Sequence, residues 1–103
     1  MGKKAVLSAL RRFRRELDGQ GIKVARMVLF GSWARGRPRE GSDIDVVVVS
    51  EDFAGKTFWE RVTILGNAVY AVFEPIQAVA MTPAEWDVGD SAIAEYARKG
   101  QPV

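Results

Sequence analysis

The chain has 103 residues, of which 48% are hydrophobic and 27% charged. This length is typical of one small domain, so we predict a single domain over residues 1–103. No apolar run approaches the roughly 20 residues that a membrane-spanning helix needs. The apolar stretch between the lysines near the N-terminus and Arg11 is shorter than the roughly 7–15 residues of a secretory signal. We therefore predict a cytoplasmic protein that does not contact a membrane.

Two residue types are missing, and their absence excludes several kinds of catalytic and metal site. The chain has no cysteine and no histidine. Disulfide frameworks, thiolate metal sites and catalysis by serine–histidine or cysteine–histidine pairs are therefore excluded. The remaining chemistry rests on carboxylates, hydroxyls, backbone amides and cations, with a hard, oxygen-binding metal where a metal is needed.

Positive charge is concentrated in the first part of the chain. Residues 1–39 contain eleven Lys or Arg and two acidic residues, whereas the remainder contains four basic and eleven acidic residues. This asymmetry indicates a polyanionic or acidic partner, or else a solvated helix face formed by Arg11, Arg12, Arg14 and Arg15. Because the sequence has no motif that reads nucleic acid, direct nucleic-acid binding is not expected.

Hydrophobic periodicity predicts the elements of the first half. A helix is expected at about residues 3–18, followed by a buried strand over 22–30 that ends at Gly31. Ser32 is suited to cap a short helix through Arg35, and a polar loop follows over 36–42. A second strand is expected over 43–50.

The second half continues the alternation of helices and strands. We predict a helix over about 58–73, from an apolar stripe, and a third strand over 76–81. The segment Thr82-Pro83-Ala84-Glu85 predicts a helix start, and a last helix is expected at about 91–98. The order predicts an α/β (α+β) fold with a three-stranded, possibly mixed sheet covered by helices on one side. We expect the three tryptophans to pack in the core or an interface, at Trp33, Trp59 and Trp86.

Two carboxylates lie two residues apart at the start of the second strand. Strand alternation places Asp43 and Asp45 on one face, opposite the apolar Ile44, Val46 and Val48. Two carboxylates at this spacing can bind one or two divalent cations. A purely structural alternative is that they are solvated and pair with Arg35 or with Arg39.

The turn before these carboxylates is suited to bind phosphate. Gly31 allows the backbone to approach a ligand closely, and Ser32 supplies a hydroxyl and an amide at the start of a short helix. A phosphate site near a pair of carboxylates is what a metal-bound triphosphate requires. An ordinary strand-to-helix turn is the alternative.

The combined pattern resembles a known signature. The residues Gly31-Ser32-Trp33-Ala34-Arg35-Gly36, followed by Ser42-Asp43-Ile44-Asp45 and a run of valines, resemble the nucleotidyltransferase signature of the DNA polymerase beta superfamily. In length and layout the chain is most similar to the minimal nucleotidyltransferases. These are often encoded beside a HEPN-type protein as toxin–antitoxin pairs, so the resemblance implies a HEPN-type partner.

The resemblance also implies residue roles. Gly31, Ser32 and Ser42 would bind the nucleotide, and Arg35 would neutralise phosphate charge or instead pair with Glu40 or Asp43. Asp43 and Asp45 would bind two Mg²⁺ or Mn²⁺ ions and act catalytically. The implied reaction moves a nucleoside monophosphate, expected to be AMP from ATP, onto a hydroxyl of a protein or small molecule.

One position departs from the family pattern. Members usually supply a third carboxylate five residues before the Thr-Pro of the next helix, where this chain has Gln77. An amide is a weak metal ligand and cannot accept a proton at neutral pH. Glu74 is the nearest carboxylate, but strand parity places it on the opposite face unless a bulge intervenes. The chain is therefore either an enzyme with a modified site or a non-catalytic module that binds a nucleotide or a partner.

Overall fold

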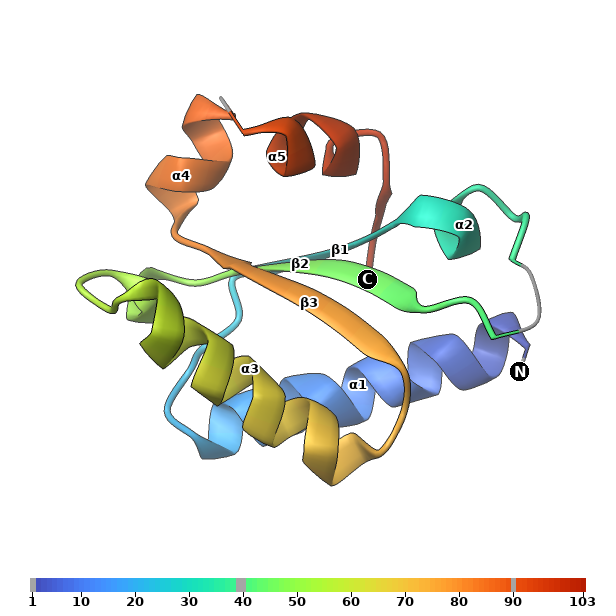
Figure 1. Cartoon of the computed structure of the whole chain (residues 1–103), viewed down its shortest axis with the longest axis horizontal. Helices are drawn as coiled ribbons and strands as arrows, with labels where there is room; N and C mark the ends of the chain where they lie inside the picture. The colour runs from blue at the N-terminus through green and yellow to red at the C-terminus, as the bar shows by residue number, and fades with distance from the viewer. Residues whose placement is uncertain (1, 39–40, 90) are drawn as a thin grey trace.

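The computed structural model describes residues 2–38, 41–89 and 91–103, in which helices and strands alternate (Figure 1). The elements follow the predicted order closely. They are α1 (Lys3–Gly19), β1 (Arg26–Phe30), α2 (Gly31–Ala34), β2 (Ile44–Val49), a 3₁₀ turn (Glu51–Phe53), α3 (Phe58–Val72), β3 (Ile76–Met81), α4 (Pro83–Val88), α5 (Ala92–Ala97) and β4 (Gln101–Pro102).

The sheet is mixed, as predicted, but it has four strands rather than three. The strand order is β3-β2-β1-β4, in which β2 and β3 are parallel and the other neighbours antiparallel. The additional strand, β4, pairs with the outer side of β1, and Val103 N–H donates to the Met27 carbonyl oxygen at 3.0 Å. A two-residue strand that contains Pro102 has no alternating pattern from which it could be predicted.

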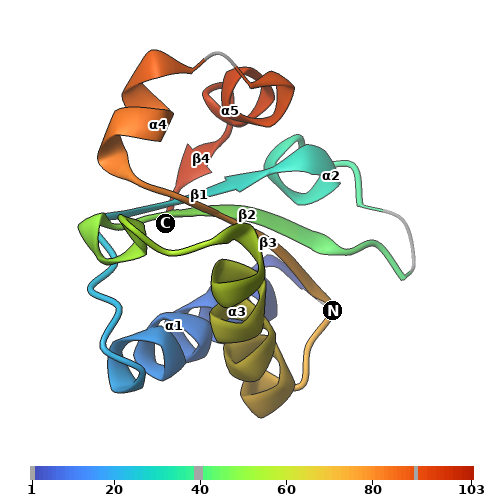
Figure 2. The ribbon, with the colours of Figure 1, turned by 60° about the vertical axis from the view of Figure 1, so that its left-hand side comes forward.

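Helices cover both faces of the sheet, which corrects the prediction of a single covered face. The helices α1 and α3 lie on one side, and α4 and α5 lie on the other (Figure 2). The reason is that β2 is apolar on both faces over its second half. Val46 and Val48 belong to the core beneath α1 and α3, whereas Val47 and Val49 pack with Trp86 of α4. A strand that is buried on both faces reads as a continuous apolar run.

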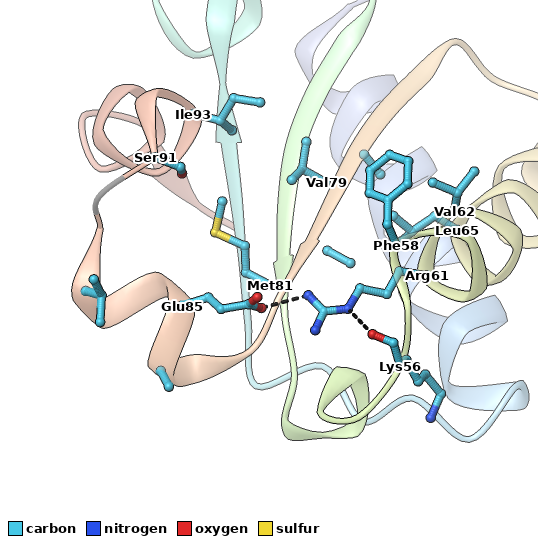
Figure 3. A pocket seen from close by; sticks show the side chains of 14 residues that line it. Lys56, Phe58, Arg61, Val62, Leu65, Val79, Met81, Glu85, Ser91 and Ile93 are labelled. Atoms are coloured by element: carbon cyan, nitrogen blue, oxygen red, sulfur yellow. Dashed lines mark hydrogen bonds and ion pairs between the residues drawn. The ribbon is translucent and has the colours of Figure 1, made fainter.

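The edge strand β3 runs along the floor of an apolar groove. The groove has a volume of about 860 Å³ and lies between α3 and the α4–α5 pair (Figure 3). Phe58 and Val62 line it from α3, and Ile93 lines it from α5. Arg61 reaches across to Glu85 with an N···O distance of 2.7 Å. The groove is thus bordered by apolar side chains and crossed by one ion pair.

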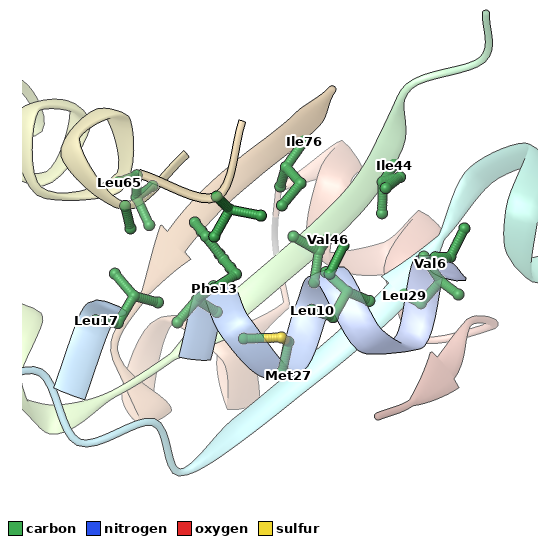
Figure 4. Packing of buried hydrophobic residues seen from close by; sticks show 14 of the residues in the cluster. Val6, Leu10, Phe13, Leu17, Met27, Leu29, Ile44, Val46, Leu65 and Ile76 are labelled. Atoms are coloured by element: carbon green, nitrogen blue, oxygen red, sulfur yellow. The ribbon is translucent and has the colours of Figure 1, made fainter. Parts of the chain in front are cut away.

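The main core lies between α1, α3 and the sheet (Figure 4). The predicted stripe of α1 is confirmed, because five of its apolar residues are buried: Val6, Ala9, Leu10, Phe13 and Leu17. The repeat of three and four residues places them on one face, while the arginines between them stay in solvent. Burying a large apolar side chain stabilises the fold by roughly 1.5–3 kcal/mol. This layer therefore carries much of the stability.

Helix α3 differs from its predicted packing. It begins at a capping box in which the Thr57 hydroxyl accepts from Glu60 N–H, and the Glu60 carboxylate accepts from Thr57 N–H. Its buried residues are Leu65, Ala68 and Val72. The other predicted stripe members are less enclosed: Val69 is partly buried, whereas Phe58, Trp59, Val62 and Phe73 are exposed. The expectation of core packing is confirmed for Trp33 and Trp86, and Trp59 lies outside the core of the chain.

The helices α4 and α5 are joined by the side chain of Arg98. The predicted helix start is confirmed, since Thr82 and Glu85 form a reciprocal capping box with Pro83 at the first helical position. The Arg98 guanidinium donates to the carbonyl oxygens of Trp86 and Asp87 and lies 5.0 Å from the centre of the Trp86 ring. It thereby donates to carbonyl oxygens at the end of α4 that have no N–H donor within the helix. In the described residues, no helix has the length and apolar character needed to cross a membrane.

Candidate functional site

The two aspartates lie at the start of β2, whereas α4 and α5 cover the same face of the sheet farther along the strand. Ile44, Val46 and Val48 are completely buried in the main core, as strand alternation predicts. Asp45 is the second residue of β2 and is partly buried, and Asp43 comes just before the strand and is exposed. In the sheet register, Asp45 is paired with Phe30 of β1 and with Gln77 of β3.

Gly31 lies against the carboxylate of Asp45. Its backbone has φ +74°, and a Cβ at this position would collide with Asp45 Oδ2 and come within 3.2 Å of Cγ. Glycine is therefore required for two reasons: the left-handed backbone and the close approach of a carboxylate. The turn continues directly into α2, where partly buried Ser32 is the next residue. The structure thus brings the predicted turn and Asp45 together.

Gln77 is on the same face as the aspartates. Its Nε2 donates to Asp43 Oδ2 at 3.4 Å, and its backbone position is opposite Asp45 in the parallel pair. Glu74 is not part of this group. Its carboxylate lies 3.8 Å from the Arg12 guanidinium of α1, on the side of the main core. The parity prediction therefore holds: Gln77 is beside the aspartates and Glu74 is not.

The local charge favours a bound cation. The pKa of Asp45 is raised above its usual 3.8, first by burial and then by the neighbouring Asp43 charge, while Arg35 acts in the opposite direction. A cation placed beside both carboxylates would offset the burial and the neighbouring charge that disfavour the ionised form of Asp45. Both are hard oxygen ligands, so this pair of carboxylates fits Mg²⁺ or Mn²⁺. Among the described residues, no three acidic side chains cluster to hold a metal.

Arg35 and Ser42 are held by aromatic residues. The Arg35 guanidinium donates to the Tyr96 hydroxyl and lies 5.8 Å from that ring's centre. It acts on Asp45 only through its charge, and the other predicted partner, Glu40, lies outside the described residues. The carbonyl oxygen of Ser42 accepts from Trp33 Nε1 at 3.4 Å.

Sequence reasoning missed Tyr96. It is 61 residues from Arg35 along the chain, and α5 carries it to the β1 end, where its ring meets Phe30 edge-on at 5.8 Å. An aromatic residue on a short predicted helix gave no signal for this role. The groove beside β3 is a separate feature, because none of the predicted site residues lines it.

Comparison with known proteins agrees with this geometry. The fold is similar to a crystal structure of a candidate nucleotidyltransferase from Sulfolobus solfataricus, with a TM-score of 0.58 and 21% sequence identity. The similarity covers 85% of this chain and 82% of that chain. No curated protein sequence matches significantly. The family model described as a nucleotidyltransferase domain matches residues 7–98. Such domains generally use divalent metals and nucleoside triphosphates. The chain therefore belongs to the nucleotidyltransferase domain family.

Proposed function

We propose that this chain transfers a nucleoside monophosphate, AMP from ATP, from a metal-bound triphosphate to a hydroxyl of a protein or small molecule. One observation carries the proposal: the Asp45 carboxylate lies against the Gly31 turn, with Asp43 and Gln77 on the same face. A phosphate held at the turn and a cation held by the aspartates would then be neighbours. Nucleotidyl transfer requires this arrangement.

Each residue has a role that follows from its chemistry. The first amides of α2 have no acceptor within the helix, so Ser32 can offer an amide and its hydroxyl to phosphate oxygens. Ser42 borders the same site, and Arg35 adds positive charge close to Asp45. Asp43 and Asp45 would hold Mg²⁺ or Mn²⁺, which neutralises phosphate charge and favours ionisation of the acceptor hydroxyl when bound. The acceptor oxygen attacks the α-phosphorus, pyrophosphate leaves, and the hydroxyl proton passes to solvent.

A second candidate function is binding without turnover, and Gln77 favours it. The amide cannot take a proton from the acceptor, and its hydrogen bond to Asp43 occupies one carboxylate oxygen. The chain would then bind nucleotide or a partner protein with the same surface. By resemblance to the minimal nucleotidyltransferases, we propose a HEPN-type protein as partner, an antitoxin role, and a single domain over residues 1–103.

Titration calorimetry tests the binding part of this proposal. ATP binding should require Mg²⁺ or Mn²⁺, and the combined Asp43→Ala and Asp45→Ala substitutions should remove that requirement. Asp87→Ala, an exposed carboxylate on α4, serves as the matched control and should bind like the wild type. Equal binding with and without metal would show that the basic surface simply attracts polyanions.

Transfer of labelled AMP distinguishes the enzyme from the binding module. If the missing carboxylate limits the reaction, Gln77→Asp or Gln77→Glu should accelerate transfer about a hundredfold, because it restores a metal ligand and a base. Glu74→Ala should leave the rate unchanged, since Glu74 faces Arg12. Loss of activity in Glu74→Ala, but not in Gln77→Ala, would reverse the assignment of the third ligand.

A further inference from the structure

The outward face of α3 is apolar, although it faces solvent. We define the α3 stripe as Trp59, Val62, Gly66, Tyr70 and Phe73, which recur at intervals of three and four residues. In the isolated chain Trp59 is 73% exposed, Tyr70 82% and Phe73 86%. The opposite side of the helix packs on the core through Leu65, Ala68 and Val72. A contiguous exposed apolar patch of this kind typically marks an interaction surface.

Two residues of this stripe have a conformational cost that packing within the chain does not explain. Gly66 lies in the middle of a helix, where glycine costs about 1 kcal/mol relative to alanine. A Cβ at Gly66 would meet no atom within 4 Å, so the chain's own packing does not require glycine there. Phe73 ends the helix at φ 58°, a left-handed conformation that is uncommon for a bulky side chain. Both features make sense if something outside the chain approaches this face closely.

The spacing of the stripe is symmetric about Gly66. Trp59 precedes Gly66 by seven residues and Phe73 follows it by seven, while Val62 and Tyr70 lie four residues to either side. A surface that pairs with its own copy about a two-fold axis needs this kind of self-complementarity. Two antiparallel copies crossing at Gly66 would place Trp59 against Phe73 of the second copy. The same crossing would place Val62 against the larger Tyr70.

We propose that two copies of this chain form an antiparallel dimer through the α3 stripe, with Gly66 at the two-fold axis. The exposed apolar area of the stripe is sufficient for a standard protein interface. Aromatic side chains bury about 150–250 Å² each, and three of them are largely exposed here. Together with Val62 and neighbouring Phe58, they approach the roughly 800 Å² per partner of a standard interface. The stripe itself contains no charged residue, so its pairing does not require a stripe charge to be buried.

Oligomeric state is the first test. Sedimentation equilibrium of the wild-type chain should give twice the 11.4 kDa chain mass at micromolar concentration. Tyr70→Glu should give the monomer mass with an unchanged far-ultraviolet circular dichroism spectrum. Val88→Glu, which alters an exposed apolar residue on α4, should remain dimeric. A wild-type chain that stays monomeric at all soluble concentrations overturns the proposal.

Cysteine cross-linking tests the direction of the pairing, because the natural chain has no cysteine. Gly66→Cys should form a disulfide with its own copy under mild oxidation. Trp59→Cys and Phe73→Cys should each cross-link weakly alone, yet efficiently when the two variants are mixed, because residues 14 apart on a helix are about 21 Å apart.

Two results would contradict the antiparallel dimer, one from cross-linking and one from partner binding. Efficient cross-linking of Trp59→Cys with itself would indicate a parallel arrangement. A chain that is monomeric alone, but loses binding to a HEPN-type protein in Tyr70→Glu, would assign the stripe to a different partner.

Discussion

The two faces of β2 differ in how far their apolar character extends. Beneath α1 and α3 the strand is apolar throughout, and Ile44, Val46 and Val48 are completely buried. On the other face, Val47 and Val49 are covered by α4 and α5, but Asp45 replaces the apolar residue at the start of the strand. One face therefore supplies stability along its whole length. The other combines a small core with a charged end, where we propose that metal and nucleotide bind, so substitutions on the two faces should have separable effects.

The largest expected effect is a loss of stability in the fully apolar layer. Phe13→Ala should reduce the free energy of unfolding by about 3–5 kcal/mol, because it leaves a cavity in the main core. This is a large share of the roughly 5–15 kcal/mol typical of a domain. Val88→Ala, at an exposed position on α4, should cost about 0.5 kcal/mol or less. Urea unfolding measures both, and equal losses would contradict the division between the layers.

The next effect concerns activity rather than stability. Asp45→Asn should slow AMP transfer at least about a hundredfold, equivalent to about 2.7 kcal/mol of transition-state stabilisation. Without metal, its unfolding free energy should equal or exceed that of the wild type, because the like charge beside Asp43 is removed. Asp87→Asn is the matched control for both measurements. A strong destabilisation would mean that Asp45 has a structural role.

A smaller effect is expected at the turn, where Gly31→Ala combines strain with a collision. An alanine at φ +74° is strained, and its Cβ would displace the Asp45 carboxylate. We expect a loss of about 1–3 kcal/mol in unfolding free energy, together with weaker nucleotide binding. Gly36→Ala isolates the strain, because Gly36 has φ +70° and its Cβ would meet nothing within 4 Å. If both variants bind ATP equally, the approach of Asp45 to Gly31 is unimportant for binding.

The smallest effect is a pH-dependent contribution of Glu85, on α4, to the free energy of unfolding. Hydrogen bonds from Thr82 and then from Arg61 lower the pKa of Glu85 below its usual 4.5. Because the folded pKa is lowered, this stabilisation is complete above about pH 4.5 and disappears as the pH falls through the folded value. Glu85→Gln should therefore cost about 0.5–1 kcal/mol at pH 7, and this cost should shrink as the pH falls below about 4.5. Glu95→Gln is the control, and a difference that persists in acid would contradict the assignment.

Local patterns predicted much of the fold and the arrangement of the carboxylates. Alternation in β2 was sufficient to place Asp43 and Asp45 opposite Ile44, because the period of a strand is fixed at two residues. The capping signal at Thr82 was equally local. In contrast, β4 is too short to carry a pattern. Hydrophobicity alone also could not show which apolar side of α3 packs on the sheet. The contact between Arg35 and Tyr96 depends on how α5 returns over the sheet, which no local pattern records.

The hydrogen bonds by which Arg98 joins α4 and α5 have a consequence for motion in the folded state. Helices of six residues are not stable by themselves, so α4 and α5 persist because they pack on the sheet and share one guanidinium. They should open together as a single low-energy unit, and their amide hydrogens should exchange at similar rates, faster than those in the middle of α1. Each opening would carry Tyr96 away from Arg35. Fluctuations of α4 and α5 would thereby change the freedom of the Arg35 guanidinium, whose charge acts on Asp45.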